Sequence, residues 1–149
     1  QTIQALEIVG FPKVVDGDTI HIKSYKIRLE GIDAPEMKQK CKKPYIQIQI
    51  FNFQKDYYCG LTSKKKLIKK IGKKSVKCIL LGKDRYKRYL AKCFKGNINL
   101  NKWMVRNGYA VAYRKYSKLY IFDENLKKEE KLGLWRGTFI KPEKWRKSN

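Results

Sequence analysis

Residues 14–36 concentrate acidic side chains in a chain that is otherwise strongly basic. This stretch, VVDGDTIHIKSYKIRLEGIDAPE, holds five of the 13 Asp and Glu residues, against 36 Lys and Arg in the whole chain. Asp18 follows a glycine turn and Asp33 ends the next alternating strand, so the two carboxylates can converge on one hard cation. Pro35 stiffens the turn that presents Glu36 beside them. The pattern predicts a metal site suited to phosphate chemistry, although DGDT and DAPE are also ordinary turn sequences.

Residue types that are rare or absent narrow the chemistry further. The only histidine, His21, alternates with isoleucines and reads as a surface or half-buried strand residue. One histidine excludes a two-histidine ribonuclease mechanism and an H-E-x-x-H zinc site, and there is no P-loop sequence for nucleoside triphosphates. Carboxylates, arginines and tyrosines remain. Arg28 has the strand parity to point toward the same side as Asp33, and such a set suffices for metal-assisted attack on phosphate.

The formal net charge of +23 indicates an anionic partner, because this much like charge repels itself in a compact chain. Nucleic acid is the first candidate and an anionic membrane surface the second. Lysines scattered over solvated surfaces, with no partner, are the simpler alternative. No apolar run approaches the ~18 residues that a membrane-spanning helix needs. The chain begins with Gln1, which suggests that a secretory signal was removed or that this end is artificial.

Four cysteines, an even number in a small chain, fit a secreted disulfide framework. Zinc sites favour close pairs of ligands, which this spacing lacks, and four unrelated buried thiols are the other alternative. Cys78 and Cys93 lie almost symmetrically about the turn at residues 84–87, so a hairpin would bring them to facing positions. Cys41 lies in the segment that returns to the helix carrying Cys59. We therefore expect the pairs Cys41–Cys59 and Cys78–Cys93.

Hydrophobic periodicity predicts strands first and helices later. Residues 5–11, 13–22 and 24–32 read as a meander of strands, and residues 75–81 and 88–94 as a hairpin. Three helices are expected, at residues 56–72, 99–108 and about 123–131. The first has Leu61, Leu67, Ile68 and Ile71 on its apolar side, and Asn99 is a possible cap of the second.

This order of elements predicts an α+β fold in which a five-stranded β-barrel of the oligonucleotide-binding (OB-fold) type packs with three α-helices. Residues 1–149 are expected to form a single domain, because the length suits one hydrophobic core and no composition break marks a second. The C-terminal tail from about residue 136 reads as irregular.

Five ordered blocks, VVDGDTIHI, IRLEGIDAPE, DRYKRYLA, LNKWMVRNGYAVAY and EEKLGLW, resemble the staphylococcal nuclease (thermonuclease) family. The resemblance covers roughly residues 8–136. It implies the five-stranded barrel with three helices. It also implies a Ca²⁺-dependent endonuclease that hydrolyses DNA and RNA with little sequence preference and leaves 3′-phosphates. We expect such a protein to be a monomer that is secreted or periplasmic.

The resemblance also implies a role for each matching residue. Asp18 and Asp33 correspond to the calcium carboxylates, and Glu36 to the residue that handles the attacking water. Arg28 and Arg88 correspond to the two arginines that grip the phosphate. The implied substrate-binding residues are Arg85, Tyr86 and Tyr113, although tyrosines in such a domain can equally belong to the core.

Two departures from the family pattern bear on activity. Lys87 stands where the pattern D-[RK]-Y-G-R has glycine, and a lysine with positive φ there would cost about 1 kcal/mol and could shift Arg88. Ala34 replaces a threonine, a mild change if only the backbone carbonyl is used. Residues 38–53 match loosely and could steer substrate or form a solvated loop.

The sequence allows two other functions. One is a catalytically silent nucleic-acid-binding module on the same fold, and the other is a cationic protein that acts by charge alone. Retention of all five of the residues Asp18, Arg28, Asp33, Glu36 and Arg88 favours the enzyme.

Overall fold

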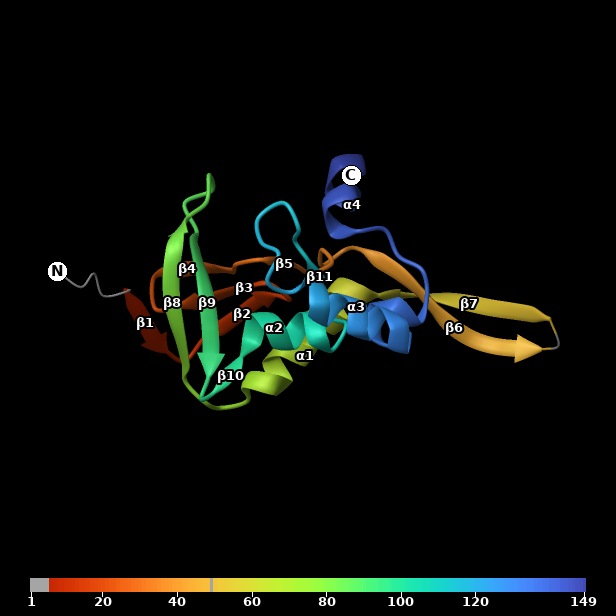
Figure 1. Ribbon diagram of the computed structural model, residues 1–149, viewed down its shortest axis with the longest axis horizontal. Coiled ribbons are helices and arrows are strands. Elements are labelled where there is room, and N and C mark those ends of the chain that lie inside the picture. The colour runs from red at the N-terminus through yellow and green to blue at the C-terminus, as the bar shows by residue number, and fades with distance from the viewer. Residues whose placement is uncertain (1–5, 49) are drawn as a thin grey trace.

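The computed structural model describes residues 6–48 and 50–149, so Gln1 and the first residue of the strand expected at 5–11 lie outside the described residues. A curled, open β-sheet forms one side of the molecule and three helices pack near it (Figure 1). The α+β class with a curled sheet of the OB type is therefore confirmed, with more strands and one more α-helix than the sequence predicted.

The strands are β1 (Glu7–Gly10), β2 (Lys13–Asp16), β3 (Thr19–Ile22), β4 (Tyr25–Leu29), β5 (Ile32–Asp33), β6 (Lys40–Ile48), β7 (Phe51–Tyr58), β8 (Val76–Lys83), β9 (Tyr89–Lys95), β10 (Ile98–Asn99) and β11 (Val111–Ala112). The main sheet has the order β1-β8-β9-β4-β3-β2, and β10 pairs with β9. All of its pairs are antiparallel except β4 with β9. Separate two-stranded pairs are formed by β5 with β11 and by β6 with β7.

The helices are α1 (Cys59–Ile71), α2 (Leu100–Arg106), α3 (Ile121–Glu130), a 3₁₀ turn (Gly133–Arg136) and α4 (Pro142–Ser148). Asn99 caps α2 as predicted, and its side chain accepts a hydrogen bond from the Lys102 amide. None of the described helices has the length and apolar character needed to cross a membrane.

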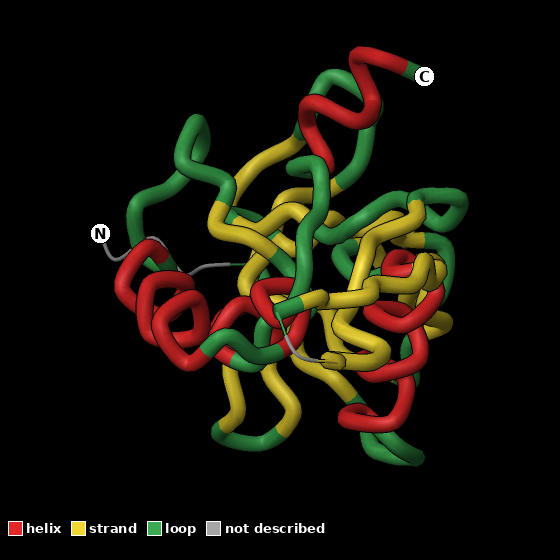
Figure 2. The backbone as a smooth tube through the Cα atoms, turned by 90° about the vertical axis from the view of Figure 1, so that its right-hand side faces the viewer, coloured by secondary structure: helices red, strands yellow, loops and turns green. Residues whose placement is uncertain are grey.

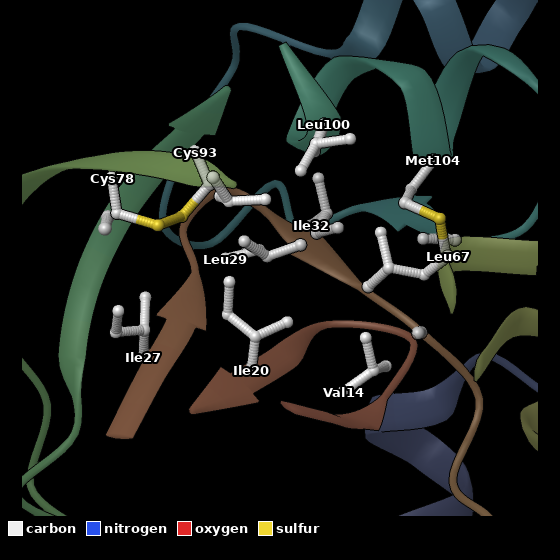
Figure 3. Packing of buried hydrophobic residues seen from close by; sticks show 14 of the residues in the cluster. Val14, Ile20, Ile27, Leu29, Ile32, Leu67, Cys78, Cys93, Leu100 and Met104 are labelled. Atoms are coloured by element: carbon white, nitrogen blue, oxygen red, sulfur yellow. A yellow bond between two sulfur atoms is a disulfide. The ribbon is translucent and has the colours of Figure 1, made fainter. Parts of the chain in front are cut away.

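The hydrophobic core lies between the main sheet and the helices α1 and α2 (Figure 3). Ile20, Ile27 and Leu29 point into it from the sheet and are fully buried, and Leu67 and Met104 meet them from the helices. The alternation predicted for β4 is confirmed, since Ile27 and Leu29 share one side of the strand. This packing fixes β3 and β4, and with them the turns that carry the acidic residues.

The two predicted disulfides are both present. Cys78 and Cys93 occupy directly opposed positions of β8 and β9, and their bond links the two strands at the edge of the core in Figure 3. The bond between Cys41 and Cys59 joins β6 to the first residue of α1. The predicted pairing is therefore confirmed for both disulfides, and the hairpin argument for Cys78 and Cys93.

The prediction for the apolar side of α1 was wrong at Ile68, which is 45% exposed. The helix buries the row Cys59, Gly60, Ser63, Leu67 and Ile71 instead. These positions recur every three to four residues, so small and polar side chains near the start of the helix belong to its buried face. Ile68 is apolar but lies off this row, so it faces solvent.

Two segments differ from their sequence interpretation. The strands β6 and β7, which fell largely within the loosely matching region, form a long hairpin that extends away from the sheet (Figure 1). The C-terminal tail is not irregular throughout, because Pro142–Ser148 is helical. Seen from the side in Figure 2, α4 stands apart from the other helices next to the chain end marked C.

Candidate active site

The two turns that carry the candidate metal carboxylates are bonded to each other. Asp18 lies in the turn between β2 and β3, and its Oδ2 accepts a hydrogen bond of 2.7 Å from the amide of Ala34. The Leu29 amide donates to the carbonyl oxygen of Asp18 at 2.8 Å. Asp33 ends β5, which is held in place by β11 through the pair Asp33 and Val111. The fold therefore brings Asp18 and Asp33 to one site, as the sequence predicted.

Arg28 connects these carboxylates from β4. Its Nη2 lies 3.3 Å from Oδ2 of Asp18 and 3.2 Å from Oδ1 of Asp33. Its Nη1 donates to the carbonyl oxygens of Leu29 and Ile32 at 3.0 and 2.9 Å. Arg28 is only 8% exposed, because two carboxylates and two carbonyl oxygens hold its guanidinium group between the turns.

Arg146 of α4 is the functional candidate that sequence reasoning missed. Its Nη1 donates to Oδ1 of Asp33 at 2.8 Å and to Oε1 of Glu36 at 2.9 Å, while its Nη2 donates to Oδ2 of Asp33 at 3.1 Å. Nη2 also lies 3.5 Å from the hydroxyl of Tyr113. One guanidinium group thus joins Asp33, Glu36 and Tyr113, all of which the sequence had proposed as site residues.

A weak signal for α4 was present in the sequence. KPEKWRK places Pro142 at the first helical position, Glu143 in the first turn and basic residues in the last turn, which are all helix signals. Nothing local indicates that this short helix turns back onto residues more than one hundred positions earlier. That contact depends on the tertiary path of the chain.

Glu36 is held by the residues around it. Its amide donates to Oε1 of Gln39, which is fully buried. A Cβ at Gly60, the second residue of α1, would collide with the carbonyl oxygen of Glu36, so only glycine allows the helix to approach this closely. The Glu36 side chain itself is 34% exposed and can meet both solvent and a ligand.

The acidic groups differ in how readily they ionise. Burial raises the pKa of Asp33 to about 6, although the hydrogen bond from Arg146 and the charge of Arg28 oppose the shift. Burial and the neighbouring Asp18 raise the pKa of Asp16. Burial acts on Asp18 as well, but the charge of Arg28 and hydrogen bonds outweigh it and hold the pKa of Asp18 below its ordinary value. Of these three aspartates, Asp18 is the one whose ionised form its surroundings favour.

Three predicted site residues lie together in the turn between β8 and β9. Arg88 donates through Nε to Oδ2 of Asp84 at 2.8 Å. The guanidinium carbons of Arg85 and Arg88 lie 5.0 and 5.4 Å from the centre of the Tyr86 ring. The contacts of Arg88 are thus with its own turn. This turn rises on the same side of the molecule as residues 113–120 and α4 (Figure 1).

Lys87, which stands where the family pattern has glycine, has the positive φ that glycine favours. Its φ is 62°, in the left-handed region that glycine tolerates best. The amides of Tyr86 and Arg88 donate to Oδ1 of Asp84 and hold the turn despite the lysine. The condition raised for this position, a lysine with positive φ, is therefore met.

A pocket of about 250 Å³ opens beside Asp33, between β11 with the residues that follow it and α4. Its lining includes Tyr113, and its cationic members are Arg114, Lys115, Lys141 and Lys144. A polyanion whose phosphate reached Asp33 and Glu36 would pass over these charges.

The oxygen atoms at this site are of the kind that calcium prefers, but the side chains are not arranged around a common point. Within residues 6–48 and 50–149, no three His, Cys, Asp or Glu side chains form a group ready to hold a metal ion. Asp18 and Asp33 nevertheless supply buried carboxylate oxygens, the ligands that a hard cation prefers, and both already share the cationic Arg28. Two guanidinium groups on Asp33 show that this position attracts positive charge. The residues therefore fit calcium, provided that Arg146 gives way.

Comparison with known proteins identifies the family to which this chain belongs. A model of the family described as "Staphylococcal nuclease homologue" matches residues 26–137, which is more than half of the chain. The succinoglycan biosynthesis protein ExoI of Rhizobium meliloti (strain 1021) is 32% identical over 132 residues, which cover 87% of this chain and 65% of that protein. An uncharacterized endonuclease of Haemophilus influenzae is 34% identical over 143 residues, with 91% and 70% covered.

A third relative is the probable staphylococcal-like nuclease CAN3 of Oryza sativa subsp. japonica, 33% identical over 150 residues. The match covers 97% of this chain but 35% of the rice protein, so the chain spans about a third of that relative and 65% of the rhizobial one. The family match contains Arg28, Asp33, Glu36 and Arg88, and it ends before α4. With the curled sheet and the acidic cluster in place, this match shows that the chain belongs to the staphylococcal nuclease family.

Proposed function

We propose that the protein is a calcium-dependent nuclease that hydrolyses phosphodiester bonds of DNA and RNA with little sequence preference and leaves 3′-phosphates. The observation that carries the proposal is one cluster of side chains. In it Arg28 bridges Asp18 and Asp33, and the guanidinium group of Arg146 joins Asp33 to Glu36. The nuclease names of two relatives support the same class of reaction.

Each group in the cluster has a separate task in this proposal. Asp18 and Asp33 would hold the calcium ion, and the ion would offset the negative charge that develops on the phosphate during attack. Glu36 accepts a proton from the attacking water or orients that water. Arg28 leaves its acceptors in part to grip a phosphate oxygen, a contact that its planar, permanently charged group makes well.

The turn between β8 and β9 supplies the second arginine. Arg88 is oriented by Asp84, so its guanidinium group is fixed on one edge and can offer the remaining N–H groups to the phosphate. Tyr86 and Tyr113 offer ring faces on which unpaired bases can stack, a contact that tolerates every base. Lys115, Lys141 and Lys144 contact the backbone phosphates that follow.

We further propose that the protein works as a monomer and outside the cytoplasm, in a secreted or periplasmic setting. The two disulfides support an oxidising compartment, since such bonds seldom persist in the cytosol.

The first test is cleavage of plasmid DNA and of single-stranded RNA, with calcium or with a chelator. We expect cleavage with calcium, loss of cleavage with chelator, and recovery when calcium is added back. The products should block extension by a polymerase until a phosphatase removes the 3′-phosphate. Cleavage that persists in chelator would remove calcium from the proposal.

Glu36→Gln separates chemistry from binding, because glutamine keeps the size of the side chain and cannot take a proton. We expect the cleavage rate to fall by about 10²- to 10⁴-fold, as for loss of a general base, with nucleic-acid affinity nearly unchanged. Glu129→Gln, an exposed change on α3, is the matched control and should cleave like the parent. Equal rates for Glu36→Gln and the parent would show that this carboxylate is not catalytic.

The alternative is a nucleic-acid-binding module that has lost catalysis, and two observations favour it. Arg146 already occupies Asp33 and Glu36, and Lys87 strains the turn of Arg88. Binding of DNA without cleavage at any calcium concentration, in both the parent and Arg146→Met, would establish this alternative.

A further inference from the structure

The segment before α4 is fixed to the body of the protein by specific contacts. A Cβ at Gly137 would collide with the carbonyl oxygen of Lys42, so the chain passes β6 as closely as glycine permits. The Lys42 amide donates to the carbonyl oxygen of Thr138 at 2.8 Å. The buried Gln39 donates to the carbonyl oxygen of Ile140 at 2.6 Å. These contacts deliver the start of α4 to the edge of the acidic cluster.

Beyond this anchored segment, α4 is attached mainly through one side chain. Among the described helices and strands, none packs broadly against α4, and Figures 1 and 2 show it standing clear of the other helices. Pro142 is buried at its start and Trp145 is half-buried. Arg146 makes the two ion pairs that reach Asp33 and Glu36. The segment before the helix is therefore anchored to the body of the protein, and the second half of the helix is attached through the ion pairs of Arg146.

Arg146 fills the place of a cation. It takes both oxygens of Asp33 and one of Glu36, three of the oxygens that the acidic cluster would offer to calcium or to the attacking water. Hydrogen bonds and the charges of Asp33 and Glu36 raise the pKa of Arg146 despite its partial burial, so the group stays charged there. A guanidinium group and a calcium ion cannot both occupy the same carboxylate oxygens, since their like charges repel at contact distance.

We propose that α4 is a displaceable cap of the active site, in which Arg146 neutralises Asp33 and Glu36 in the metal-free protein and competes with the divalent cation for them. Calcium binding and the docking of α4 then exclude each other. This inference rests on the calcium site of the proposed function, and it adds a regulating element that lies outside the family match. Because the hinge at residues 137–141 stays fixed, α4 remains close to the site after Arg146 is released.

The competition has a simple thermodynamic form. If α4 is docked on the carboxylates in most molecules, only the remaining fraction can bind calcium. The apparent calcium affinity is then the intrinsic affinity multiplied by that fraction. A charged hydrogen-bonded pair of this kind is typically strong enough to reduce that fraction at least tenfold. By linkage, saturating calcium must shift α4 away from Asp33 by the same factor.

The test measures calcium binding directly, without nucleic acid, by titration calorimetry on the full chain. We compare the parent with Arg146→Met, which keeps an unbranched apolar stem and removes the charged guanidinium group, and with Arg146→Lys. Lys147→Met is the matched control, since it removes one charge from the same helix at a side chain that is 75% exposed. A second readout is amide hydrogen exchange of residues 142–149 with and without calcium.

We expect Arg146→Met to bind calcium about tenfold or more tightly than the parent, Arg146→Lys to fall between, and Lys147→Met to match the parent. Amides of α4 in the parent should exchange faster when calcium saturates the site. Thermal unfolding checks that each variant is folded. A parent that binds no calcium while Arg146→Met does would also support the cap.

Calcium affinity that is equal in Arg146→Met and Lys147→Met, or weaker in Arg146→Met, overturns the cap while leaving the proposed nuclease intact. Unchanged exchange of α4 at saturating calcium also overturns it. If no variant binds calcium, the calcium site of the proposed function fails together with the cap. Cleavage in chelator then decides whether a nuclease remains.

Discussion

At the scale of single residues, Lys87 is one of three described lysines, with Lys23 and Lys131, whose backbone has the positive φ that favours glycine. Its φ of 62° lies in the left-handed region, and the next residue is Arg88. Lys23 has a similar φ of 57° in the turn between β3 and β4, away from the residues proposed to act on phosphate. The two lysines therefore allow backbone strain to be separated from its effect on the site.

Lys87→Gly should raise the free energy of unfolding by about 1 kcal/mol, because glycine adopts this conformation without the Cβ clash. Lys23→Gly should give a similar gain, measured by urea denaturation of both variants. We expect Lys87→Gly alone to raise the cleavage rate, since only its turn carries Arg88. Equal rates for Lys87→Gly and the parent would mean that the strain does not reach Arg88.

How far the site could be predicted depends on the sequence distance between its members. Asp18, Arg28, Asp33 and Glu36 lie in one stretch of chain, so strand parity and turn composition were enough to bring them together. Arg146 lies 113 residues from Asp33, and no local pattern connects them. Basic residues are so common in this chain that one more arginine in the tail carried no signal.

At the scale of elements, the two disulfides have different neighbours. Cys78–Cys93 ties β8 to β9 beside the core, whereas Cys41–Cys59 joins β6 to the start of α1. Sγ of Cys59 lies 3.5 Å from the carbonyl oxygen of Gln39, the residue whose side chain accepts from the Glu36 amide. The bond at β6 therefore supports the turn that presents Glu36, while the bond in the sheet lies elsewhere in the fold.

Replacing both cysteines of either pair by alanine should lower the free energy of unfolding by about 3 kcal/mol, since loops of this length constrain the unfolded chain to a similar degree. The pairs should differ in activity under conditions where both variants are folded. We expect the Cys41/Cys59 variant to lose cleavage rate and the Cys78/Cys93 variant to keep most of it. The reverse order would show that β6 does not position Glu36.

The β6–β7 hairpin is the pair of strands that the sequence did not predict. The β6–β7 hairpin mixes lysine, glutamine and isoleucine without a continuous apolar side that faces the core, so the rules for half-buried strands did not detect it. Its strands are held mainly by their mutual hydrogen bonds, and burial is seen at its base, where Cys41 joins a small apolar cluster. The β8–β9 hairpin was predicted because its alternation records a buried side, seen at Cys78 and Cys93.

At the scale of the whole molecule, the net charge of +23 should dominate encounter with nucleic acid. Each phosphate that a lysine or arginine neutralises releases condensed counterions, so the logarithm of affinity should fall linearly with the logarithm of salt concentration. Fluorescence anisotropy with labelled duplex and single-stranded DNA of two unrelated sequences measures this slope. We expect a steep slope that is the same for both sequences. Affinity that does not respond to salt would exclude a polyanion partner.

The same charge also governs how copies of the protein meet. The β6–β7 hairpin extends from the body as a two-stranded ribbon and exposes Tyr45, Ile48 and Ile50, which are 60%, 55% and 88% accessible. Such a ribbon edge invites pairing with another chain unless charge keeps the chains apart. At 1 M salt the Debye length is about 3 Å, so this repulsion vanishes. The protein should therefore resist self-association best in dilute buffers, where nucleic acid also binds most tightly. Concentrated salt both releases the nucleic acid and removes the charge repulsion that keeps the copies apart.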